Sequence, residues 1–128
     1  MADLNKIFIL HTTADRDDAN TDAGFQLVVQ TPFFDVIRNF PDLDHDERER
    51  GRTDEYVFDV SNEGVTTESE IKIRMKNTDD GWLPKTMWAI GETREGQFEL
   101  LAGHSEWPKG WFDRGDNPAG PDEHVITS

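Results

Sequence analysis

The feature that most constrains the fold is an alternation of apolar and charged residues with a period of two. In EIKIRMK, residues 70–76, Ile71, Ile73 and Met75 alternate with lysine or arginine. Successive side chains of a β-strand point to opposite faces, so this pattern predicts a strand with one face in a core and the other in water. Half-buried strands of this kind are typical of antiparallel sheets.

The same period recurs along most of the chain. Glycine, proline, asparagine and aspartate clusters separate the alternating runs, at a spacing typical of a sandwich or barrel of short strands. The segment FFDVIRNF, residues 33–40, fits a strand or a helical turn equally well, and no segment predicts a long amphipathic helix. The predicted strands cover residues 6–12, 24–30, 54–60, 70–76, 85–92, 96–103 and a short last run at 123–127.

Length and charge limit the organisation and the partners. The 128 residues fit one domain, residues 1–128, with a turn-rich C-terminal tail from about residue 113. The formal net charge of -14 repels phosphate backbones, so we expect no nucleic-acid binding, whereas multivalent cations are natural partners. Acidity spread along the whole chain is also typical of a protein solvated in high salt. The N-terminal apolar run is too short for a signal peptide, which predicts a soluble protein, cytoplasmic or peripheral to a membrane.

The sequence contains no persuasive catalytic constellation. GHSEW, residues 103–107, begins like the nucleophile elbow of a lipase but lacks its second glycine. The histidines show no zinc-ligand spacing, so we expect them on the surface or on edge strands: His11, His45, His104 and His124. There is no cysteine, which excludes disulfides and thiolate chemistry. We therefore expect a protein that is not an enzyme.

Three acidic segments separate predicted strands: DDANTDAG (17–24), DLDHDERERG (42–51) and KNTDDGW (76–82). The second starts like an EF-hand loop, but Glu47 and Thr53 occupy the positions that need glycine and glutamate. Calcium takes six to eight hard oxygen ligands, and a β-sandwich can supply them from several loops at one end. The three segments together predict a calcium site. The alternative for each carboxylate is an aspartate that caps its own turn.

Three motifs in consistent order resemble one known family. They are NTDAGFQLVV (20–29), RGRTDEYVFDV (50–60) and IKIRMKNTDDGWLPKTMWAI (71–90). From Lys6 to Trp111 the chain resembles the PLAT domain, also called the lipoxygenase-homology domain. Asn20 departs from the family pattern, which usually has a glycine there.

The resemblance implies an all-β fold, an eight-stranded antiparallel β-sandwich similar to a C2 domain. It also implies a non-catalytic module that docks to membrane lipids or to a partner protein, with calcium bound by loops at one end in several members. Carried onto this sequence, the implied calcium ligands are Asp18, Asn20, Thr21 and Asp22 in the first loop, Asp44, Asp46 and Glu47 in the second, and Asp79, Asp80 and Gly81 in the third.

The tryptophans supply candidates for lipid contact. Trp82 follows a predicted metal loop, and its indole is the first candidate to enter a lipid interface, with Trp111 as the second. We expect Trp107 to close the bottom of the sandwich and Trp88 to be half buried. A carbohydrate-binding sandwich with a structural calcium is the alternative. It would need a row of coplanar exposed aromatic rings, and only Trp88 and Tyr56 lie on predicted strands.

Overall fold

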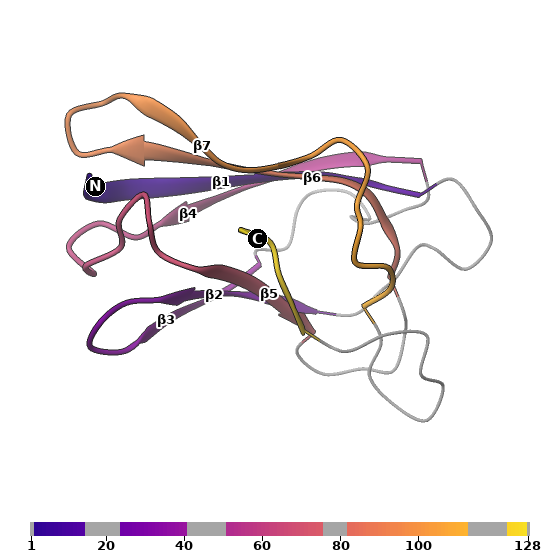
Figure 1. The fold of residues 1–128 in the computed structure, drawn as a ribbon, viewed down its shortest axis with the longest axis horizontal. Helices are drawn as coiled ribbons and strands as arrows, with labels where there is room; N and C mark the ends of the chain where they lie inside the picture. The colour runs from indigo at the N-terminus through magenta and orange to yellow at the C-terminus, as the bar shows by residue number, and fades with distance from the viewer. Residues whose placement is uncertain (1, 15–23, 41–50, 76–81, 113–122, 128) are drawn as a thin grey trace.

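The protein folds into two antiparallel β-sheets that face each other (Figure 1). The computed structural model describes residues 2–14, 24–40, 51–75, 82–112 and 123–127. These residues form strands and connections, and within them no helix is long and apolar enough to cross a bilayer. The strands are β1 (Leu4–Thr13), β2 (Phe25–Gln30), β3 (Asp35–Asn39), β4 (Thr53–Asp59), β5 (Ile71–Met75), β6 (Pro84–Thr93), β7 (Phe98–His104) and β8 (Glu123–Val125).

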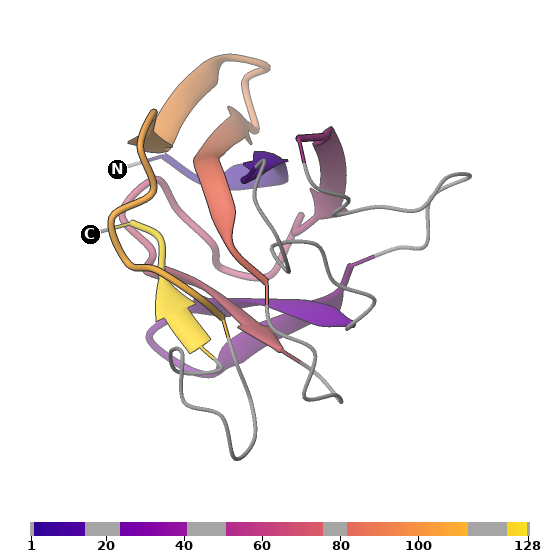
Figure 2. The ribbon, with the colours of Figure 1, turned by 90° about the vertical axis from the view of Figure 1, so that its right-hand side faces the viewer.

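The strand order confirms the expected eight-stranded sandwich. One sheet has the order β4-β1-β6-β7 and the other the order β3-β2-β5-β8. Hairpins join β2 to β3 and β6 to β7, whereas the other connections pass from one sheet to the other. Figure 2 shows the sheets as two layers, with β8 at the edge of the second. The segment that fitted either a strand or a helical turn contains β3, which pairs in antiparallel register with β2.

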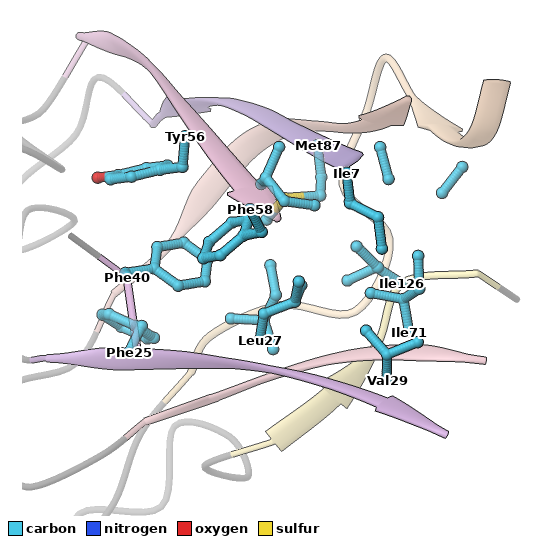
Figure 3. Packing of buried hydrophobic residues seen from close by; sticks show 14 of the residues in the cluster. Ile7, Phe25, Leu27, Val29, Phe40, Tyr56, Phe58, Ile71, Met87 and Ile126 are labelled. Carbon is cyan, nitrogen blue, oxygen red and sulfur yellow. The ribbon is translucent and has the colours of Figure 1, made fainter. Parts of the chain in front are cut away.

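The core lies between the sheets and consists of the inward-facing residues of the alternating strands. Ile71, Ile73 and Met75 are at most 1% exposed, as the period of two in β5 predicts. Aromatic rings fill the half of the core shown at the left of Figure 3, where the ring of Phe40 lies 4.7 Å from that of Tyr56. Aliphatic side chains fill the other half, and close packing of this kind keeps the two layers in fixed relative positions.

The sandwich has two different ends. At the end that we call the hairpin end, the β2–β3 turn (residues 31–34) and the β6–β7 turn (94–97) lie on the left of Figure 1. At the opposite end, which we call the loop end, the strand termini next to the acidic segments are neighbours in the sheets. The registered pairs there are Thr12 with Thr53, Thr13 with Pro84, Gln26 with Asn39, and Phe25 with Met75.

Candidate functional site at the loop end

All the predicted calcium ligands lie outside the described residues. They are Asp18, Asn20, Thr21, Asp22, Asp44, Asp46, Glu47, Asp79, Asp80 and Gly81. The described strand termini nevertheless determine where each acidic segment leaves and re-enters the sandwich. One acidic connection joins β1 to β2 (residues 15–23), the second joins β3 to β4 (41–50), and the third joins β5 to β6 (76–81). The six strand termini that border these connections all lie at the loop end (Figure 1). The topology therefore brings the described residues that border the three segments to the same end of the sandwich.

Trp82 forms the floor of the loop end. Its side chain is 0% exposed, and its indole Nε1 donates a hydrogen bond of 2.9 Å to Thr13 Oγ1. Its ring lies 5.2 Å from the ring of Phe112 and 5.1 Å from that of Phe25. The prediction that Trp82 offers an exposed indole to lipid is wrong. The chain re-enters the sandwich at this residue, where the backbones of Trp82 and Phe112 exchange hydrogen bonds of 2.9 and 2.8 Å.

Backbone hydrogen bonds continue up to the edges of the acidic segments. The amide of Thr13 donates to the carbonyl of Arg52 at 2.9 Å, and the amide of Gly51 donates back to the carbonyl of Thr13 at 2.9 Å. The amide of Ala14 donates to the carbonyl of Leu83, also at 2.9 Å. On the other flanks, the amide of Phe40 donates to the carbonyl of Phe25 at 2.9 Å, and Phe25 pairs with Met75. The described residues on both flanks of each segment are therefore anchored in the sheets.

A layer of buried polar side chains lies within the sandwich near this floor. His11 is 0% exposed, its ring stacks at 5.3 Å on that of Tyr56, and it meets the Trp82 ring edge-on at 4.7 Å. The expectation of a surface histidine is therefore wrong for His11. Asp54, opposite His11 in the β1–β4 register, is 2% exposed, and its Oδ1 lies 4.0 Å from Arg52 Nε. Within the described ranges no three histidine or acidic side chains form a group that could hold a metal.

A second aromatic cluster fastens the last strand. Trp107 packs against the core, with its ring stacked at 5.8 Å on that of Phe112, which agrees with its expected place as a plug. His124 is 8% exposed and lies on the edge strand β8, which agrees with the expected place on an edge strand, and its Nε2 lies 2.8 Å from the Trp111 carbonyl. His104 is partly exposed, and its Nε2 lies 2.8 Å from a backbone carbonyl. Trp111 is partly exposed, and its contact with lipid stays a prediction.

Acidification should destabilise the fold through His124. Burial lowers the pKa of His124 below its ordinary value of 6.5, and the positive charge of Lys109 lowers the pKa further, although the bond to the Trp111 carbonyl raises it. The unfolded chain therefore binds this proton at a higher pH than the folded chain, so stability falls as the pH drops through about 6.5. Urea unfolding at pH 7.5 and 5.5 should show a smaller pH effect in His124→Gln than in the wild type. Equal pH effects in the two proteins would contradict the assignment.

Solved structures with a similar fold were found. The alpha toxin of Clostridium absonum superposes with a TM-score of 0.76 at 20% identity, over 98% of this chain and 32% of that one. The alpha-toxin of an avian Clostridium perfringens strain gives 0.73 at 18% identity, over 96% and 31%. A coral 8R-lipoxygenase, whose structure is described as showing calcium activation via a C2-like domain, gives 0.60 at 14% identity, over 94% and 16%. The fold is a C2-like, PLAT-like β-sandwich.

These likenesses concern the fold of the PLAT-like sandwich. The chain spans about a third or less of the solved chains that it matches. No family model matches the sequence, and no curated protein matches it.

The carbohydrate alternative needs a row of coplanar exposed aromatic rings on a sheet face. The two aromatic residues that the sequence offered for such a row do not form one in the described part of the PLAT-like sandwich. Tyr56 is 1% exposed, so it cannot stack on a sugar from the outer face of a sheet. Trp88 is half buried, as expected. The partly exposed ring of Phe8 and the exposed ring of Phe98 are tilted by 52° and are not coplanar.

Proposed function

We propose that this protein is a non-catalytic, calcium-binding module whose loop end docks to a membrane surface. One observation supports the proposal most: the strand termini that border all three acidic segments lie together at one end of a C2-like sandwich. Three acidic segments that start from adjacent termini repel one another unless a cation neutralises them, and calcium prefers several hard oxygen ligands.

The proposed ligands come from each of the three segments. The first offers the carboxylates of Asp18 and Asp22, with oxygens of Asn20 and Thr21 between them. The second offers Asp46 and Glu47, with Asp44 as a substitute, and the third offers Asp79, Asp80 and the carbonyl of Gly81. The anchored flanks favour calcium binding, because they lower the conformational entropy that the segments lose when an ion binds.

Bound calcium would also let the loop end approach an anionic membrane surface. A chain with a net charge of -14 is repelled by anionic bilayers, and each bound ion adds two positive charges at the loop end. Trp82 is buried, so Trp111 is the remaining candidate for lipid contact. Its indole is partly exposed, and it precedes Phe112, which packs against Trp82. An indole at the headgroup level is favourable because its ring is apolar and its N–H is polar.

Sedimentation with anionic vesicles tests this function. The wild type should bind vesicles of pure phosphatidylserine in millimolar calcium and should remain in solution in EGTA. Trp111→Ala should bind less, because the indole contact is lost. Phe98→Ala, which removes a ring that is 62% exposed near the hairpin end, is the matched control and should bind as the wild type does. A protein that binds calcium but ignores these vesicles would exclude the lipid and favour a protein partner.

A further inference from the structure

The hairpin end carries the most exposed large apolar side chain of the described surface. Phe33, in the turn between β2 and β3, is 88% exposed, and its neighbour Phe34 is 51% exposed. Ile37, on β3, adds a third apolar side chain that is 44% exposed. We call these three residues the apolar tip. Most large apolar side chains are buried, so adjacent exposed phenylalanines at the turn of a hairpin mark a contact surface.

The turn that presents the tip is held in one shape. Thr31 Oγ1 accepts hydrogen bonds from the amides of Phe33 and Phe34 at 3.3 and 3.1 Å. The same hydroxyl donates to the Phe34 carbonyl at 2.6 Å, and the Thr31 amide donates to that carbonyl at 3.1 Å. Pro32 adds a fixed φ to the turn. The rings are therefore displayed by an ordered turn, which lowers the entropy lost when they enter another phase.

An open hollow beside the tip carries negative charge. It has a volume of about 360 Å³, and Thr31 and Pro32 of the turn form part of its lining together with Glu68 and Glu70. No lysine or arginine is among its described lining residues. Lys72 is not a lining residue, but its Nζ lies 3.7 Å from Glu70 Oε1. The hollow suits a cationic group that stands next to an apolar layer.

We propose that the apolar tip inserts into phosphatidylcholine bilayers without calcium, with the quaternary ammonium of a headgroup in the hollow beside Glu68 and Glu70. The rings of Phe33 and Phe34 pass the headgroups and reach the boundary of the acyl chains. A zwitterionic surface carries no net charge, so the acidic chain meets no long-range repulsion there. This contact is separate from the proposed calcium-dependent function, because the tip lies at the opposite end of the sandwich from the strand termini that border the acidic segments (Figure 1).

Charge and shape favour this lipid over the other occupants. Anionic lipid would face the carboxylates of the hollow and the net charge of -14. A second copy of the chain would bring the same net charge and the same acidic hollow to the contact. The rings project from a turn instead of lining a groove, which suits insertion into a soft layer.

Flotation with pure phosphatidylcholine vesicles in EGTA tests the inference. The full chain should bind at millimolar lipid, and the double variant Phe33→Ser/Phe34→Ser should bind about tenfold more weakly or worse, since each ring loses its burial in the apolar layer. The matched control is Phe98→Ser/Leu100→Ser, which removes two side chains that are 62% and 64% exposed on β7, and it should bind as the wild type does. Glu68→Gln/Glu70→Gln should weaken binding less than the tip variant.

Several results would overturn the inference. Equal binding by the wild type and the tip variant, or loss of binding in the β7 control alone, would remove the tip as the lipid contact. Unchanged binding by Glu68→Gln/Glu70→Gln would remove the headgroup from the hollow. A wild type that ignores these vesicles but forms a dimer lost in the tip variant would assign the tip to a second copy. The calcium-dependent function is tested by a different experiment, with anionic vesicles in calcium, so its failure can be told apart from the failure of this inference.

Discussion

Replacing Trp82 with alanine should lower the free energy of unfolding by about 3–5 kcal/mol. The side chain is fully buried among the rings of His11, Phe25 and Phe112, so its removal leaves a cavity in the floor of the loop end. It also leaves the buried hydroxyl of Thr13 without its indole donor. Natural domains have only about 5–15 kcal/mol of stability, so this variant should be close to unfolding. Urea denaturation measures the loss.

Two further variants separate packing from the hydrogen bond. Trp82→Phe keeps an aromatic ring and removes the donor to Thr13, so it should cost about 1–3 kcal/mol. Trp88→Ala is the matched control, because this tryptophan is half buried on the outer face of β6, and its replacement should cost less than that of Trp82. Equal losses at the two tryptophans would contradict the assignment of Trp82 to the core. Because Trp82→Ala should lose much of its stability, this variant is a poor probe of lipid contact.

Calcium should raise the stability of the fold by about 2.7 kcal/mol at one hundred times its dissociation constant, because the ion binds the folded chain. For a chain of this length the melting temperature should rise by roughly 5–10 °C. Thermal unfolding monitored by circular dichroism, in calcium and in EGTA, measures the effect. Sodium chloride at the same ionic strength is the necessary control, since salt alone screens the repulsion within a chain of net charge -14.

Conservative substitutions in the first acidic segment identify the source of the calcium effect. Asp18→Asn and Asp22→Asn keep the size of each side chain and remove one negative ligand, so each should weaken calcium affinity in a calorimetric titration. If the segment only forms a turn, both changes relieve repulsion and leave stability unchanged or slightly higher. Unaltered affinity in both variants would exclude this segment from the site, and an unchanged melting temperature of the wild type would exclude the calcium hypothesis.

The sequence predicts the strands well wherever one face is buried and the other is wet. In β5 the alternation records burial residue by residue, and the structure confirms it. In β3 only five residues pair, and Val36 is the only strand residue with a buried side chain, so no period is established. The pairing of β3 with β2 over the turn at Thr31 decides its conformation, and this contact has no local signature.

The candidate site is predicted less completely, because burial at the loop end depends on residues far apart in the chain. Trp82 follows an acidic segment, which suggested exposure, but its partner Phe112 lies 30 residues later. His11 is buried against Tyr56, which reaches it through the β1–β4 pairing. Neither contact leaves a periodic pattern in the sequence. The proposed calcium ligands lie outside the described residues and stay predictions.

The position of β1 between β4 and β6 affects the risk of aggregation during translation. This strand needs β4 on one side and β6 on the other, and β6 begins at Pro84, about 70 residues after β1 ends. At roughly 5–20 residues per second, the apolar run at residues 7–10 waits several seconds for its second partner. An unpaired apolar strand invites pairing with other chains, and like charges oppose such encounters. We therefore expect the net charge of -14 to oppose aggregation while the nascent chain is still incomplete.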